Sequence, residues 1–204
     1  MRNAFEAAFV ALVSAGLVLT PVASAEGKIP KKRLRDGVYT SPDGEFTVKL
    51  PQLITPGARS EERENGPAIW AVFFSDDFGN VFFVLPSDNS TAKRTLEQFT
   101  ADIQVGGAVR SKETIQTALG PQVRVVGVVK DGSPVSGSTV RDGKRIEVRL
   151  DLVKTSSLFL HGTRFYEVTV GVSRIHDDQT DDMLLERAKK KLEEFLSGLV
   201  LKNP

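Results

Sequence analysis

The chain has 204 residues, with 27 lysines and arginines against 26 aspartates and glutamates, so its formal net charge is only +1. Nucleic-acid-binding proteins usually carry a strong basic excess, and this balance argues against that class. There is no cysteine, which excludes disulfide bonds, a thiol nucleophile and cysteine-ligated zinc. Hydrophobic burial must therefore stabilise the fold, and the chain is long enough to form one such core.

Residues 1–25 have the pattern of a secretory signal peptide. Arg2 is followed by an apolar run from residue 7 to 19, and the small residues Ala23-Ser24-Ala25 form a cleavage site. The run is shorter than the roughly 20 residues of a spanning helix. We predict export to the periplasm or the extracellular space, with no membrane span after cleavage. An uncleaved segment anchoring the chain to the inner membrane is the alternative.

Residues 26–36 are basic and poor in apolar side chains, and they are predicted to form a flexible linker. From residue 37 onward, short apolar runs alternate with turn residues, which predicts hairpins of a mainly antiparallel sheet. The most apolar pair, residues 68–75 and 81–85, is predicted at the sheet centre. Further strands are predicted at 38–39, 46–50, 113–118, 123–130, 145–152 and 165–172, with loops at 52–66, 131–143 and 156–162.

Two segments have apolar residues at helical spacing. Residues 91–105 predict a first helix, in which Thr95 and Gln98 have the spacing of a capping box. Residues 181–197 predict a long amphipathic C-terminal helix with Thr180 as its N-cap. Gly198 is expected to end this helix in the left-handed conformation, leaving residues 199–201 as a short apolar tail.

This order of elements predicts a single α+β domain over residues 37–201, a mainly antiparallel sheet sandwiched by helices. Within it, residues 39–51 read YTSPDGEFTVKLP. This stretch resembles the opening of PsbP-like proteins, in which a short strand and a turn precede F-x-V-x-x-P. The resemblance covers residues 37–201 and implies an α–β–α sandwich that serves as an accessory or binding module without a catalytic centre.

The chain carries no G-x-S-x-G nucleophile motif and no glycine-rich phosphate loop between a strand and a helix. With the resemblance, this predicts an exported, non-enzymatic accessory or binding protein without a cofactor. It would act through a protein partner or a small ligand of the cell envelope.

One acidic cluster supports an alternative from another class. It consists of His176, Asp177, Asp178, Asp181 and Asp182, whose oxygen and imidazole ligands suit a hard cation such as Ca²⁺ or Mn²⁺. The protein would then be a metal-dependent envelope enzyme or a cation-binding protein. The calcium-loop pattern is absent, however, and an acid-rich helix N-terminus is the simpler interpretation.

Overall fold

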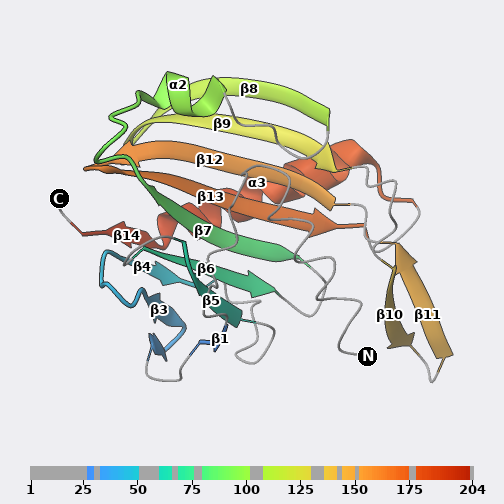
Figure 1. Cartoon of the computed structure of the whole chain (residues 1–204). Helices are drawn as coiled ribbons and strands as arrows, with labels where there is room; N and C mark the ends of the chain where they lie inside the picture. Colours follow the sequence, from blue (N-terminus) through green and yellow to red (C-terminus); the bar gives the residue numbers. More distant parts are fainter. Residues whose placement is uncertain are drawn as a thin grey trace.

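An eight-stranded antiparallel sheet forms the centre of the computed structural model (Figure 1). The structure describes residues 27–29, 33–50, 60–65, 69–75, 80–101, 108–129, 136–141, 144–149, 152–174 and 178–202. The predicted signal peptide lies outside them. In spatial order the strands are β1 (Gly27–Lys28), β5 (Ser60–Glu64), β6 (Trp70–Ser75), β7 (Val81–Asp88), β13 (Arg164–Ser173), β12 (Leu152–His161), β9 (Gly120–Val129) and β8 (Ala108–Thr117).

One face of this sheet is covered by a helix and a second sheet. The helix is α3 (Asp181–Ser197), and we call the face that it covers the helix face. The second sheet has the order β14 (Leu199–Leu201), β4 (Phe46–Lys49), β3 (Val38–Thr40) and β2 (Leu34–Arg35). Because side chains alternate along a strand, each central strand sends every second residue to the helix face and the others to the opposite face.

The main hydrophobic core lies between the helix face and α3. Four apolar residues of the helix are buried, namely Leu184, Ala188, Leu192 and Phe195, and the centroids of the Phe195 and Phe82 rings lie 5.5 Å apart. Tyr39 joins the small sheet to this core, since its ring packs edge-on against Phe74 at 5.7 Å. The core members on the central strands and α3 include Val72, Phe82, Val84, Phe159, Val168, Val170, Val172, Leu184, Ala188, Leu192 and Phe195.

The predicted fold class, a mainly antiparallel sheet sandwiched by helices, is wrong. Most described residues lie in antiparallel strands, and the molecule is a β-rich sandwich. On the helix face, α3 shares the covering layer with a sheet. The other described helix, α2 (Leu96–Ala101), begins at residue 96 where 91 was predicted, and residues 102–105 of that prediction lie outside the described residues. The α–β–α sandwich that the PsbP-like resemblance implied is corrected with it.

The helical periodicities themselves were informative. Helix α3 begins and ends at the predicted residues, and the Met183 N–H donates to the hydroxyl of its N-cap, Thr180. The capping box of α2 is present in both directions, because Thr95 N–H donates to Gln98 and Gln98 N–H donates to Thr95. Gly198, however, has φ −91°, so the left-handed helix end predicted there is wrong.

Several strands lie where the sequence predicted other structure. Strands β1 and β2 fall within the predicted linker, β5 within a predicted loop, and β14 in the predicted apolar tail. Residues 156–162 were predicted as a loop, yet Ser156 and Ser157 lie in the middle of β12. The polar loop at 131–143 contains a strand of the hairpin β10 (Ser136–Arg141) and β11 (Lys144–Arg149), which stands apart from the large sheet in Figure 1.

The turn within the PsbP-like stretch has a structural role. The Asp43 carboxylate accepts hydrogen bonds from the Ser41 hydroxyl at 2.6 Å and from Arg164 of β13 at 2.8 Å. Burial opposes ionisation of Asp43, but these hydrogen bonds outweigh it and hold the pKa of that carboxyl below its usual value. Gly44 adopts φ +69°, which glycine tolerates without strain. The turn therefore fastens the small sheet to the large one.

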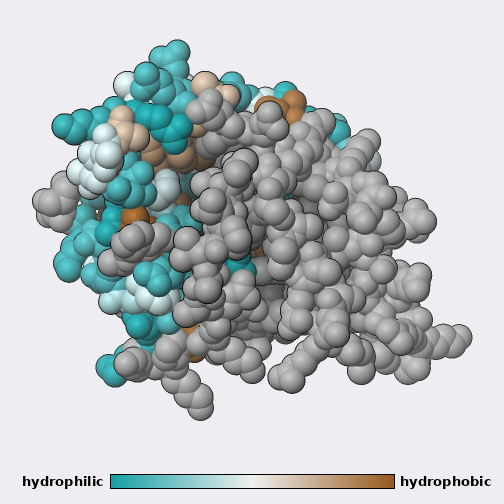
Figure 2. All heavy atoms as spheres, in the orientation of Figure 1, coloured by the Kyte–Doolittle hydropathy of each residue, from teal (hydrophilic) through white to brown (hydrophobic). Residues whose placement is uncertain are grey.

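The described surface in the same orientation is mainly hydrophilic, with scattered hydrophobic side chains (Figure 2). Among the described helices, none is long and apolar enough to cross a bilayer.

Candidate functional site

The predicted cation site begins at the N-terminus of α3. His176 and Asp177 lie outside the described residues, and Asp178 is exposed. Asp181 and Asp182 stand in the first turn of the helix, where the unpaired backbone N–H groups favour negative charge.

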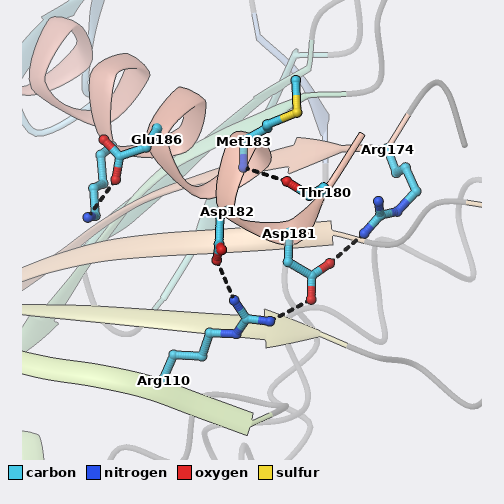
Figure 3. A network of polar contacts seen from close by, with 8 residues as sticks. Arg110, Arg174, Thr180, Asp181, Asp182, Met183 and Glu186 are labelled. Carbon is cyan, nitrogen blue, oxygen red and sulfur yellow. Dashed lines mark hydrogen bonds and ion pairs between the residues drawn. The ribbon is translucent and has the colours of Figure 1, made fainter. Parts of the chain in front are cut away.

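Two arginines engage these carboxylates (Figure 3). Arg110 of β8 contacts Asp181 at 2.6 Å and Asp182 at 3.1 Å, and Arg174 at the end of β13 contacts the second oxygen of Asp181 at 2.5 Å. Arg110 is the extra residue of a β-bulge, because the register of β8 on β9 shifts between Val109 and Ser111. A bulge re-aims a side chain, and here it accompanies a contact between the sheet edge and α3.

These contacts bear on the cation hypothesis. Asp181 is bound by two guanidinium groups, so it would have to release both ion pairs to ligate a metal. No group of three or more potential metal ligands is found among the described residues. The five-residue site stays a prediction, while Asp181 and Asp182 dock α3 onto the sheet.

A second candidate lies on the opposite face of the large sheet. The side chains of Lys154, Ser156, Glu167 and Thr169 follow one another across β12 and β13, and we call these four residues the polar strip. Lys154 is 7% exposed, Ser156 4% and Thr169 0%. Glu167 is half-buried. The strip is central in the sheet, because β13 and β12 each have strands on both sides.

The strip is connected by short hydrogen bonds. Ser156 and Thr169 are directly opposite in the β12–β13 register, and their hydroxyl oxygens are 2.6 Å apart. The Thr169 hydroxyl is 3.0 Å from Glu167 Oε1 and donates to it. Because the Thr169 hydroxyl donates its one hydrogen to Glu167, Ser156 must be the donor to Thr169. One chain of hydrogen bonds therefore ends on the carboxylate.

Burial raises the pKa of the Glu167 carboxyl, because desolvation disfavours its charged form. The hydrogen bond from Thr169 and the positive charge of Lys154 oppose this shift without cancelling it. The strip therefore holds a carboxyl group that is more easily protonated than an exposed glutamate. Its neighbours are a cation and two hydroxyls.

Two glycines flank the lysine of the strip. Lys154 is directly opposite Gly127 of β9 on one side and Gly171 of β13 on the other. Directly opposite residues send their side chains to the same face, so this row of the sheet has no side chain on either side of Lys154. Beyond Thr169 lies Phe83, which packs on Phe73 with ring centroids 5.7 Å apart. The face thus combines a cation, hydroxyls and an aromatic surface.

Sequence reasoning missed the polar strip. Ser156 was placed in the predicted loop at 156–162. Glu167 and Thr169 fall within the strand predicted at 165–172 but were not expected to be buried. No local signal marked these residues as buried, because an antiparallel sheet commonly keeps one face in water, and polar residues that alternate with apolar ones are then expected to be exposed.

The comparisons with known proteins do not identify the chain. No family model and no curated protein matches it. A crystal structure of a protein from Bacteroides thetaiotaomicron is similar at 12% identity and a TM-score of 0.43, covering 82% of this chain. This chain spans about half the length of that protein, namely 48%.

Proposed function

We propose that this is an exported, non-enzymatic binding protein whose small ligand lies against the polar strip. Export rests on the signal-peptide pattern of residues 1–25. The ligand site rests on one observation: Lys154 and Glu167 are placed with two hydroxyls at the centre of a sheet face. Burying charged groups costs free energy, and apolar residues of similar size would stabilise such a position better. A buried charged cluster that weakens the fold is typical of a functional site.

The chemistry of the strip favours a ligand with one acidic group. Lys154 supplies a positive charge, and the two glycines beside it place no side chain between it and a compact carboxylate or phosphate group. The hydroxyls of Ser156 and Thr169 supply hydrogen-bonding groups, and Phe73 and Phe83 supply an adjacent aromatic surface for an apolar body. Small-molecule sites commonly combine mostly apolar surroundings with a few convergent polar groups, as this face does.

The experiment is native mass spectrometry of the C-terminally tagged protein, purified gently from its own envelope fraction. We expect a bound small molecule that dissociates on unfolding. A panel of aliphatic and aromatic carboxylates and phosphate monoesters, tested by thermal shift, then defines the chemical class. Lys154→Met removes the positive charge and is expected to abolish both signals.

The matched control is Lys191→Met. Lys191 is a second buried lysine, 6% exposed, but it lies on α3 with its ammonium 5.6 Å from the Phe82 ring, on the helix face. This variant should keep the bound molecule and the thermal shifts, each measured against its own unliganded protein. Equal loss in both variants, or no adduct and no shift in the wild type, overturns the proposal. A stoichiometric protein in the purified sample would instead identify a protein partner.

A further inference from the structure

The two edges of the large sheet differ in length. At one edge β1 has two residues, whereas at the other β8 has ten, and no described strand lies beyond it (Figure 1). From Ser111 to Thr117 every side chain of β8 is exposed or half-exposed. A long edge strand presents backbone N–H and C=O groups that another strand can pair with.

The bulge at Arg110 defines which part of β8 is regular. After it, Ser111 to Thr117 pair with β9 without interruption, from Val126 to Gly120. This regular segment has seven residues, and Thr114 is its centre. An antiparallel pairing of two identical strands about a two-fold axis also has one central residue, which faces its own copy.

We propose that two copies of this chain pair through β8, antiparallel, with Thr114 on the two-fold axis. Ser111 of one copy then lies opposite Thr117 of the other, Lys112 opposite Gln116, and Glu113 opposite Ile115. All seven regular residues take part, and the two large sheets become one continuous sheet. This inference is independent of the ligand site proposed above.

Charge selects this register over its neighbours. In an antiparallel pair, residues that lie directly opposite each other have their side chains on the same face of the sheet. A two-fold pairing therefore has one residue on the axis, and each neighbouring register places the next residue of the chain there. A register with Lys112 or Glu113 on the axis places that residue opposite its own copy, so two like charges face each other, which is destabilising. Centring on Ser111 places Arg110 opposite Lys112, and centring on Ile115 leaves only five residues paired. The register on Thr114 has no such conflict, and threonine pairs are favourable across strands.

The cations near this edge are held by the molecule itself. Lysines on an edge strand usually discourage strand pairing. Here the Lys112 ammonium donates to the Thr100 carbonyl of α2 at 3.0 Å, and Arg110 is bound by Asp181 and Asp182 of α3. Both charges are thereby drawn toward a face of the sheet, which leaves the backbone edge open to a second strand.

The native absence of cysteine allows a clean cross-linking test on the full chain. Thr114→Cys places two thiols directly opposite each other, at the Cα separation of 4.5 to 5.5 Å that antiparallel pairs have and disulfides accept. We expect rapid formation of a covalent dimer under mild oxidation. The controls are Ser111→Cys and Thr117→Cys, equally near the edge, whose own copies would stand about 20 Å apart and should cross-link far more slowly.

A second measurement covers the unmodified protein. Sedimentation velocity over a concentration series should show the wild-type mass rising toward that of a dimer. Thr114→Asp places two like charges on the axis and should remain monomeric with an unchanged circular dichroism spectrum. A wild type that stays monomeric, Thr114→Cys that cross-links no faster than the controls, or Thr114→Asp that still dimerises each overturns the proposal. If the wild type stays monomeric, or if Thr114→Cys cross-links no faster than the controls, the bulge only protects the edge from pairing with another strand.

Discussion

The two faces of the large sheet carry different kinds of side chain, although the same strands form both faces. On the helix face, β7 and β13 present Phe82, Val84, Val168 and Val170, and α3 buries them in one continuous apolar core. One residue along, the same strands present Phe83, Glu167 and Thr169 to the opposite face. Both faces bury polar groups, since Ser157 donates to Gln122 on the helix face, but the polar strip adds a lysine and a glutamate at the centre of the opposite face.

The largest expected effect is on the helix face. Phe195→Ala removes a fully buried ring that contacts Phe82. A truncation of this kind costs about 3 to 5 kcal/mol, because a cavity remains where the ring was. We expect a loss of that size in the free energy of unfolding, measured by urea denaturation. A change below 1 kcal/mol would contradict the assignment of α3 as the main cover of the sheet.

The next effect concerns the junction of α3 with the small sheet. A Cβ added at Gly198 would lie 2.8 Å from the Lys49 carbonyl oxygen and 2.9 Å from its Cβ, both on β4. Gly198→Ala therefore forces a backbone shift, with an expected cost of about 1 to 3 kcal/mol. Gly37 is the control position, because a Cβ added there would meet no atom within 4 Å. Its φ is +75°, so its alanine variant should be destabilised only by the strain of that backbone conformation. Equal stability of Gly198→Ala and the wild type would argue against the close approach.

A matched pair of substitutions compares the faces directly. Thr155 and Thr169 are both 0% exposed, but they point to opposite faces. Thr169 contacts Ser156 and Glu167, so Thr169→Val should cost about 1 to 3 kcal/mol by leaving these groups without a partner. The Thr155 hydroxyl has no hydrogen-bond partner within the described part of the chain, so Thr155→Val should be neutral or stabilising.

Thermal unfolding of both variants under one buffer condition provides the readout. Opposite signs would confirm that the Thr169 hydroxyl, unlike the Thr155 hydroxyl, stabilises the fold through its hydrogen bonds. The same sign for both would remove the distinction between these two positions.

The smallest effect is a dependence on pH. Because the folded-state pKa of Glu167 is raised, the folded protein binds a proton more readily than the unfolded chain between the two pKa values. Its contribution to stability is therefore most favourable below about pH 4, near the unfolded pKa, and is lost as the pH rises through the folded pKa. Glu167→Gln should be more stable than the wild type at neutral pH.

That stabilisation should disappear at low pH, where Glu167 is protonated in both states. Melting temperatures from pH 3 to 8 test this. The control is Glu186→Gln, an exposed position on α3 whose substitution should leave the pH profile nearly unchanged. A constant offset for Glu167→Gln at all pH values would contradict the raised pKa.

The sequence predicted the helix face far better than the opposite face. Periodicity located α3 to the residue, because its apolar stripe and its Thr180 cap are local signals. The apolar hairpin of β6 and β7 was likewise readable from composition. The polar strip was not, because its meaning depends on which strands become central, and that is a property of topology. Strands β3 and β4 were predicted, but the separate sheet that they form was not, for the same reason: β14 acquires its role only by pairing with β4, about 150 positions earlier.

This pairing has a consequence for the order in which the covering layer assembles. Strand β4 precedes its partner β14 by about 150 residues, and the Lys49 N–H is bonded to the Gly198 carbonyl at 2.8 Å. The covering layer of the helix face therefore cannot close until all the strands between them, and α3, have been synthesised. Such late long-range closure slows folding. Until then, the apolar side chains of the helix face lack part of their cover.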